Sequence, residues 1–181
     1  MITVEIKNKI LVAEAKRWIG VTEESGDNKG QCVQMFQKAC DNKAAGESWC
    51  MAFVQFCLKN TDSLCVDVLK SMGKNNLFLS EHCLTVWNNS PKSCRVDKPM
   101  IGSIAIWQMG ETTSGHTGIV TEIGQATFKT IEGNTGPGAG VVREGDGVYE
   151  KTRTMNQIGN MKLLGFLLPY YFRLVVTRFF I

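Results

Sequence analysis

The sequence is poor in histidine and has no close pairs of cysteines. Only two of its 181 residues are histidines, so a mechanism that needs an imidazole has two candidates for it. No two of the seven cysteines are separated by only two residues, which is the spacing with which one turn presents two thiolates to a tetrahedral zinc ion. We therefore expect no bound metal. The odd number and irregular spacing of the cysteines favour reduced thiols over three disulfides with one free thiol.

The chain also lacks a strong excess of charge of either sign. Its 20 lysines and arginines against 17 acidic residues give a net charge of +3, which is too small and too dispersed for a surface that follows a nucleic-acid backbone. A hydrophobic fraction of 44% and a charged fraction of 20% are typical of a globular protein. We expect one domain over residues 1–181, with its core at about 10–170, and no nucleic-acid partner.

No secretory signal or membrane-spanning segment is recognisable. Charged residues interrupt positions 1–18, which lack the unbroken apolar core of a signal peptide, so we expect synthesis in the cytoplasm without a signal peptide. The C-terminal tail, residues 171–181, is too short for a membrane helix and is broken by Arg173 and Arg178. We expect an edge strand or an extension packed on the body, rather than a cationic tail that touches a membrane, and no stable membrane insertion.

Apolar residues at helical spacing predict helices in the first third of the chain. Residues 9–20 form one such segment, which ends at Gly20, a suitable C-terminal cap. Residues 32–40 predict a second, shorter helix. A third begins at Cys50, and its apolar residues cover nearly the whole circumference, as in a buried helix. With Ser48 as its N-cap, the Cys50 thiol would lie in the first turn, where unpaired N–H groups and the helix dipole stabilise a thiolate.

The later part of the chain predicts strands. After residues 60–100, where few regular elements are expected, apolar residues alternate with period two. The expected strands are residues 103–107, 116–123, 127–132, 140–144, 147–154 and 162–169. Helices followed by an antiparallel sheet indicate the α+β class.

The position of Cys50 suggests a nucleophile, which needs a base and a group that orients the base. His82 lies in the irregular middle of the chain, whereas His116 opens a predicted strand behind two small residues that leave its ring accessible. Each feature alone has a simpler structural explanation, because a cysteine in an apolar helix is more often a small core residue. Together, a thiol at a helix start and a base on a strand match the division of labour in papain-like enzymes.

The hairpin that follows His116 supplies the third group. If it turns at Gln125, Asn134 faces His116 and Glu132 lies diagonal to it, all on one face of the sheet. A carboxylate or amide that accepts the ring N–H fixes the tautomer of the imidazole. A shift of the register by one residue would turn Glu132 to the other face.

These motifs resemble a known family. "SWCMAFVQFCL", followed by "GHTGIV" and "IEGN", resembles the CHAP and NlpC-type amidohydrolases, papain-like enzymes that cut amide bonds in bacterial peptidoglycan. The segment "AEAKRWIGVTEESGDNKG" is similar to the lead-in of the phage and bacterial CHAP subgroup, so the resemblance spans about residues 10–170. It implies a papain-like domain whose N-terminal helices pack on an antiparallel sheet.

The resemblance also implies roles for individual residues. Cys50 matches the nucleophile, His116 the base and Glu132 the residue that orients the base. Asn134 matches a polar position that takes this third role in some relatives. The Cys50 backbone N–H would donate to the oxyanion. Residues expected to contact the substrate are Trp49, Ser114 and Trp107.

Two departures from the family pattern affect these assignments. Many relatives have Gly-Asp where this chain has Gly-Ser at residues 102–103, which leaves the loop geometry open. "KGQC" also resembles the nucleophile motif of another CHAP subgroup, which makes Cys32 a rival of Cys50. Some relatives bind calcium, but Asp27 and Asn28 lack the carboxylate density of a dedicated loop. We expect no cofactor.

The implied function is hydrolysis of an amide in peptidoglycan through a thioester, by a monomer that acts on the cell wall after release or delivery. The bond is either the N-acetylmuramoyl-L-alanine amide or a bond of the stem peptide or cross-bridge. A phage or prophage endolysin is expected. The alternatives are a secreted antibacterial amidase effector and a non-catalytic peptidoglycan-binding module on the same fold.

Overall fold

The structure is a computed structural model that describes residues 2–69, 74–138, 145–156 and 159–171. Its helical elements are α1 (Ile2–Lys16), α2 (Gln31–Asp41), α3 (Cys50–Leu69), α4 (Cys83–Asn89) and the 3-10 turn η1 (Lys92–Cys94). Its strands are β1 (Arg95–Val96), β2 (Ile104–Met109), β3 (Gly115–Ile123), β4 (Thr127–Thr135), β5 (Gly147–Thr154) and β6 (Met161–Leu167).

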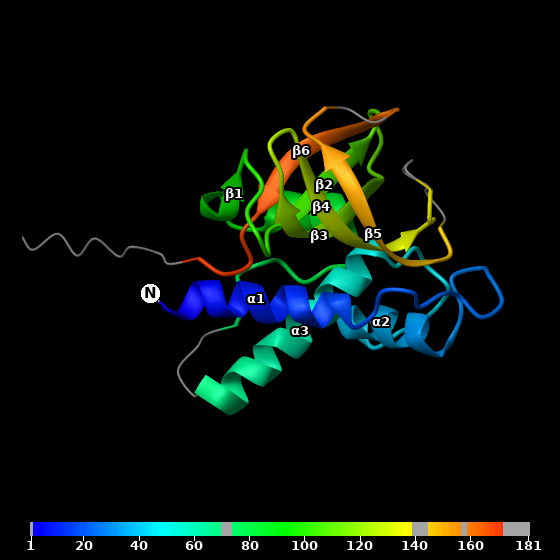
Figure 1. The fold of residues 1–181 in the computed structure, drawn as a ribbon. Helices are drawn as coiled ribbons and strands as arrows, with labels where there is room; N and C mark the ends of the chain where they lie inside the picture. The colour runs from blue at the N-terminus through cyan, green and yellow to red at the C-terminus, as the bar shows by residue number, and fades with distance from the viewer. Residues whose placement is uncertain (1, 70–73, 139–144, 157–158, 172–181) are drawn as a thin grey trace, which may run out of the picture.

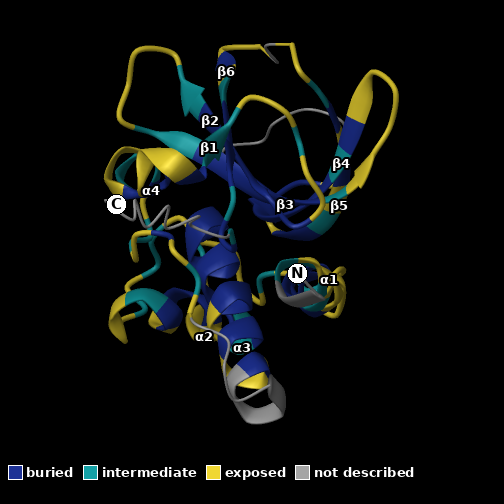
Figure 2. Cartoon of the chain, turned by 90° about the vertical axis from the view of Figure 1, so that its left-hand side faces the viewer, coloured by how far each residue is buried: buried dark blue, intermediate teal, exposed yellow. Residues whose placement is uncertain are grey.

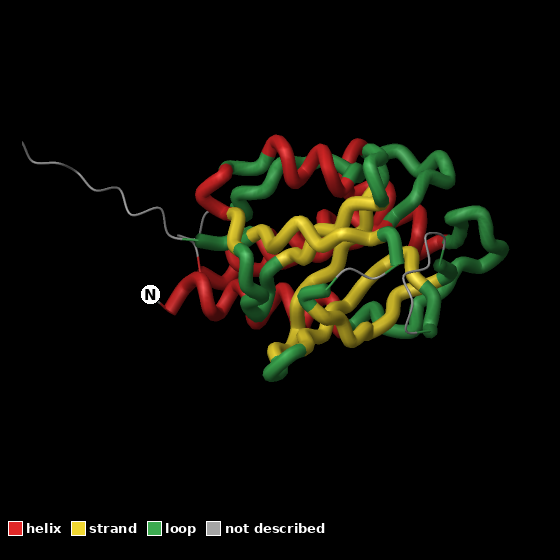
Figure 3. The backbone as a smooth tube through the Cα atoms, turned by 90° about the horizontal axis from the view of Figure 1, so that it is seen from above, coloured by secondary structure: helices red, strands yellow, loops and turns green. Residues whose placement is uncertain are grey.

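The strands form one antiparallel sheet that lies over a layer of helices. Their order is β1-β6-β2-β3-β4-β5, so the chain returns from β5 at one edge to place β6 beside β2. Figure 1 shows α1, α2 and α3 together below the sheet. From above, the strands lie over these helices and cross the molecule at several angles, as expected for a twisted sheet (Figure 3). The α+β class predicted from the sequence is confirmed.

The helix α3 lies at the centre of the main hydrophobic core. Its first half is buried almost all round, including Phe53, Val54 and Leu58, which have no exposed surface. Figure 2 shows that this buried first half of α3 is the part nearest the sheet. A buried side chain of this size stabilises the fold by about 1.5–3 kcal/mol. The burial holds the start of α3 rigidly against β3 and β4, which both contact the helix.

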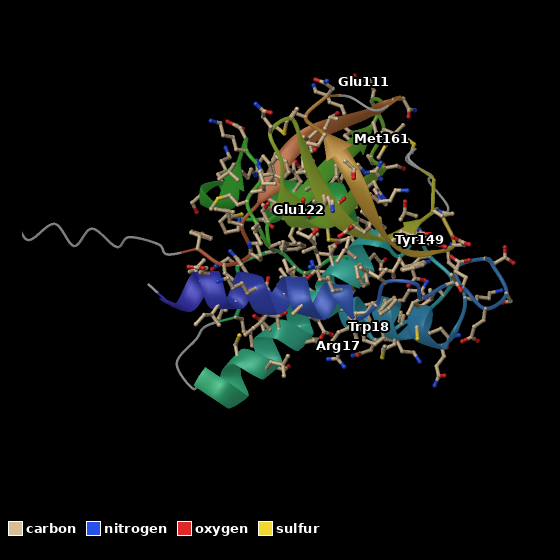
Figure 4. The ribbon with its side chains drawn as sticks, in the orientation of Figure 1. Arg17, Trp18, Glu111, Glu122, Tyr149 and Met161 are labelled. Carbon is tan, nitrogen blue, oxygen red and sulfur yellow. The ribbon has the colours of Figure 1, made fainter. Side chains whose placement is uncertain are left out.

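A second apolar cluster forms around side chains that the strands direct to their other face. Trp107 stacks on Phe128 with the ring centroids 6.3 Å apart, and Phe128 meets Phe166 edge to face at 5.2 Å. Met161 belongs to the same cluster. Figure 4 shows it well away from Trp18, which packs among the helices. Both faces of the sheet are therefore covered by apolar side chains near β2 and β3.

Most predicted elements are confirmed, with two exceptions. The first helix runs from Ile2 to Lys16 rather than over residues 9–20, because charged residues within it pack on the body; Lys7 is 5% exposed and lies over the Tyr170 ring. The prediction of few regular elements at residues 60–100 is wrong, because α3 continues to Leu69 and α4 follows.

Two of the predicted segments cannot be compared with the structure, and one further prediction concerns membrane insertion. The expected strand at residues 140–144 and the tail at 172–181 lie outside the described residues. Among the described residues, no helix is long and apolar enough to cross a membrane.

The register of the β3–β4 hairpin follows the prediction in its inner part. Ile119 pairs with Ile131 and Val120 with Thr130, as a turn centred on Gln125 requires. A bulge after Val120 then shifts the pairing by one residue toward the turn. Because the bulge lies between the turn and these pairs, the pairing on the His116 side of the bulge has the predicted register as far as Ile119 and Ile131.

Candidate active site

Cys50 is the first residue of α3, as the sequence predicts. The Trp49 carbonyl accepts the Phe53 backbone N–H at 2.9 Å, so Trp49 rather than the predicted Ser48 is the N-cap residue. The Met51 backbone N–H helps to lower the pKa of the Cys50 thiol. The thiol retains 6% of its surface exposed, and the buried helix behind it fixes its position.

His116 lies near the start of β3, and its side chain is 4% exposed. Its Nε2 is 2.8 Å from Oε2 of Glu132. The prediction that Glu132 or Asn134 reaches the ring is therefore confirmed for Glu132. With Nε2 engaged, Nδ1 is the ring nitrogen left to interact with the Cys50 thiol, whose charge favours the protonated ring. The ring also packs against Trp107, with the centroids 6.2 Å apart.

Glu132 is fully buried and has a complete set of partners. Arg153 donates to both carboxylate oxygens, from Nε at 2.8 Å to Oε1 and from Nη2 to Oε2. Thr130 Oγ1 donates to Oε1 at 2.5 Å. Burial raises the pKa of Glu132, but the hydrogen bonds from Arg153 and His116 outweigh it and lower the pKa to about 2. The carboxylate is therefore ionised at neutral pH and orients the imidazole.

The thiol and the imidazole stabilise each other in their charged forms. Burial lowers the pKa of His116, but the hydrogen bonds to Cys50 and Glu132 and their negative charges raise it to about 9. The hydrogen bond with Cys83 lowers the pKa of Cys50, and burial opposes this, while the hydrogen bond and charge of His116 lower it further. The resulting pair at neutral pH is a thiolate beside an imidazolium, which is the reactive form of a cysteine nucleophile.

Asn134 is brought to the site but does not face His116. With its amide oriented to satisfy both neighbours, its nitrogen donates to the Gly145 carbonyl at 2.8 Å and its oxygen accepts the Trp49 backbone N–H at 3.2 Å. Its backbone adopts a left-handed conformation with φ at 51°, which turns the side chain away from the regular alternation of the strand. The expectation that Asn134 faces the imidazole is therefore wrong, and the residue instead ties β4 to the start of α3.

Two of the three residues expected to contact substrate are fully buried. Trp49 has no exposed surface and donates from Nε1 to Glu23 Oε1 at 3.0 Å. Trp107 has no exposed surface either, because it lies within the second apolar cluster. The prediction of substrate contact is wrong for both. Ser114 is half-buried in the turn before His116, and its contact with substrate stays a prediction.

Two glycines allow the close packing of these groups. A Cβ at Gly118 would lie 2.6 Å from Cγ of Glu132, and a Cβ at Gly133 would lie 2.8 Å from both Phe53 and Trp49. Gly118 therefore leaves room for the carboxylate beside His116. Gly133 lets β4 approach the start of α3.

The structure separates Cys50 from its sequence rival. Cys32 is the second residue of α2 and packs, half-buried, at the border of the main core. The imidazole and Glu132 are assembled around Cys50. All seven cysteines carry free thiols. Within the described ranges, no group of three or more His, Cys, Asp or Glu side chains is arranged to hold a metal ion.

Three groups of the site were missed by the sequence analysis. Arg153 and Thr130 complete the surroundings of Glu132, and the thiol of Cys83 lies 3.6 Å from the thiol of Cys50. Thr130 shares the alternating face of β4 with Glu132, so the strand pattern contained this signal. Arg153 and Cys83 come from β5 and α4, and the sequence did not reveal how these elements pack against the β3–β4 hairpin.

Residues 23–134, more than half of the chain, match the model of the CHAP domain. The chain belongs to the CHAP domain family. The matched segment of this CHAP domain includes Cys50, His116 and Glu132, and it ends before Arg153.

One solved structure that this CHAP domain resembles is that of a wild-type endolysin, LysIME-EF1, with 15% sequence identity and a TM-score of 0.45. The alignment covers 90% of this chain and 64% of that one, so the chain spans less than two thirds of the length of its structural neighbour. No curated protein matches the sequence.

Proposed function

We propose that this CHAP domain is a cysteine hydrolase that cuts an amide bond in peptidoglycan. The observation that carries the proposal is the His116 ring, whose Nε2 lies 2.8 Å from the buried Glu132 carboxylate and which interacts electrostatically with the Cys50 thiol. A buried acid, base and thiol in this order match the requirements for nucleophilic attack on an amide. Membership in the CHAP domain family supports the same chemistry.

Each step of the proposed mechanism has a candidate atom in the site. The Cys50 thiolate attacks the amide carbonyl carbon, and its backbone N–H, at the open end of α3, donates to the developing oxyanion. His116 then gives its Nδ1 proton to the leaving amine, which departs and leaves a thioester on Cys50. Water attacks the thioester while His116 accepts its proton, and the thiolate is restored. Throughout, Glu132 accepts the hydrogen bond from the Nε2–H group and keeps the ring oriented.

Among peptidoglycan hydrolases, we propose a phage or prophage endolysin that acts on the cell wall after release. The support is the similarity of the N-terminal segment to the lead-in of phage and bacterial CHAP enzymes. A secreted antibacterial amidase effector would use the same site. We propose either the N-acetylmuramoyl-L-alanine bond or a peptide bond of the stem or cross-bridge as the target.

Purified peptidoglycan tests the proposal directly. The wild-type chain should reduce the turbidity of a wall suspension, and the Cys50→Ala variant should fold equally well and leave the turbidity unchanged. Mass spectrometry of the released fragments would identify the amide that is cut. Binding to walls without any released fragments would instead favour a non-catalytic peptidoglycan-binding module.

A further inference from the structure

A second thiol lies against the proposed nucleophile. The sulfur of Cys83 is 3.6 Å from the sulfur of Cys50, within hydrogen-bonding distance for two thiols. Both side chains are almost fully buried, with 5% and 6% of their surfaces exposed. Cys83 is the first residue of α4, so the two thiols come from the starts of two different helices.

We propose that Cys83 is a positioning residue, whose S–H donates a hydrogen bond to the Cys50 thiolate and holds that sulfur beside His116. The inference rests on the proposed function, because it assigns Cys83 a part in the same thiol chemistry. Cys83 does not touch the reacting amide in this scheme. It acts through Cys50.

The fold holds the two thiols together through the strand that carries the base. Gly115 directly precedes His116, and a Cβ at this position would lie 3.2 Å from Cβ of Cys83 and 2.4 Å from the Trp107 carbonyl oxygen. Only glycine lets β3 approach the start of α4 so closely. The close approach at Gly115 therefore sets the positions of both His116 and Cys83 relative to Cys50.

The surroundings of the two sulfurs decide which one keeps its proton. Cys50 has the His116 ring and the Met51 N–H as neighbours that favour its anion. The hydrogen bond with Cys50 and then burial raise the pKa of Cys83 well above its ordinary value, whereas the same bond lowers the pKa of Cys50. In the proposed arrangement Cys83 is the donor, and Cys50, the sulfur that interacts with the His116 imidazole, is the acceptor.

A thiol donor suits a nucleophile that must leave its hydrogen bond when it attacks. Burial removes most of the water that would otherwise solvate the Cys50 anion, and an electrostatic hydrogen bond is stronger in such surroundings. An S–H group is a weak donor, so it stabilises the thiolate without binding it as tightly as a hydroxyl would. The sulfur stays both ionised and available.

The pH dependence of Cys50 alkylation tests this role without any wall substrate. Wild type, Cys83→Ala and Cys83→Ser are kept reduced, treated with iodoacetamide across the acidic and neutral range, and mapped by mass spectrometry. Cys83→Ala should shift the midpoint of Cys50 alkylation upward by about one to two pH units, the effect of one lost hydrogen bond to a charged group. Cys83→Ser keeps a donor and should restore the midpoint to the wild-type value or below it.

A buried cysteine outside the site provides the matched control. Cys57 lies on the same helix as Cys50 and has no exposed surface, so Cys57→Ala also removes a buried sulfur but should leave the midpoint unchanged. If Cys83→Ala does not fold, Cys83→Val gives the same test, because it leaves no cavity and lacks a donor.

An unchanged midpoint in a folded donor-free variant would overturn the proposal. Equal upward shifts in the alanine and serine variants would also overturn it, because they would indicate packing rather than hydrogen bonding. Failure of the wild-type protein to release fragments from walls would reject the proposed function and would leave the alkylation result readable on its own.

Discussion

The helices α2 and α3 both carry a cysteine in their first turn after a polar loop, and of these two starts only that of α3 is surrounded by groups that activate a thiol. At the start of α2, Gly30 occupies the N-cap without a side-chain cap, and Glu24 accepts the Gln31 backbone N–H on the exposed surface. Cys32 follows, half-buried. At the start of α3, Cys50 meets the ring of His116, which is itself bonded to Glu132.

The difference shows that a helix start is insufficient for a nucleophile. The helix dipole favours a thiolate at both starts, but it is the start of α3 that lies against β3 and β4, the strands that supply a base and a carboxylate. The decisive contribution comes from residues more than sixty positions later in the chain. Reactivity in this protein is therefore expected to depend on the packing of α3 against β3 and β4.

Removal of the base should have the largest effect, because it makes the start of α3 resemble the start of α2. The His116→Ala variant should lose about 100- to 10,000-fold in the rate of wall hydrolysis, the usual contribution of a general acid–base group. His82 is a matched control, because its side chain is 72% exposed and pairs only loosely with Glu81. Turbidity assays should show wild-type rates for His82→Ala. An equal loss of the hydrolysis rate in both variants would show that His116 has no specific role in the mechanism.

Arg153 tests whether the sheet supports the ionised carboxylate. Arg153→Met leaves Glu132 buried with fewer partners, so the free energy of unfolding should fall by about 3–5 kcal/mol, as for other broken buried ion pairs. Arg17→Met breaks an ion pair with Glu14 whose arginine is 71% exposed, and should cost at most about 1 kcal/mol. Urea denaturation measures both. A small loss for Arg153→Met would mean that Glu132 is held by other contacts.

The alkaline limit of activity should depend on Glu132. The pKa of His116 is raised to about 9, so the protonated ring is present below this pH and the rate should fall as the pH rises through about 9. Glu132→Gln removes the negative charge that favours the imidazolium and should move this limit to lower pH. Glu122→Gln, which alters an exposed carboxylate of the same hairpin, should leave the limit in place. The measurement is the rate of wall hydrolysis as a function of pH. An equal shift of the alkaline limit in both variants would contradict the assignment.

The smallest effect is expected from the link between β4 and the start of α3. Asn134→Gly keeps the left-handed backbone accessible but deprives the Trp49 N–H and the Gly145 carbonyl of their partner, so stability should fall by about 1–3 kcal/mol. Asn134→Ala should cost about 1 kcal/mol more, because alanine tolerates this backbone poorly. Thermal unfolding of the two variants compares them. Equal stability of the alanine and glycine variants would argue against the strained backbone.

Much of the site could be predicted from sequence because it depends on local rules. The period-two pattern and the turn at Gln125 place Glu132 on the same face as His116, and the bulge after Val120 falls where it does not disturb this pairing. Asn134 departs from the prediction because its backbone is left-handed, a choice that follows from its tertiary contacts with Trp49 and Gly145.

The remaining differences between prediction and structure depend on long-range packing. Arg153 meets Glu132 through the pairing of β5 with β4, which contains a bulge between Glu132 and Thr135. Sequence alone does not fix the register across such a bulge. Cys83 lies on a helix of seven residues, too short for apolar periodicity to identify. Trp49 and Trp107 look like cleft residues next to the motifs, but the core buries both.

Competitive alkylation of all seven cysteines tests the central claim most directly. The folded, reduced protein is treated with limiting iodoacetamide at neutral pH, the modified residues are mapped by mass spectrometry, and residual wall hydrolysis is measured in the same samples. We expect Cys50 to react first and hydrolysis to disappear in proportion to its modification, even though Cys32 has more exposed surface. Modification of Cys32 first, with loss of hydrolysis in step with it, would place the active site at the start of α2 and contradict the account.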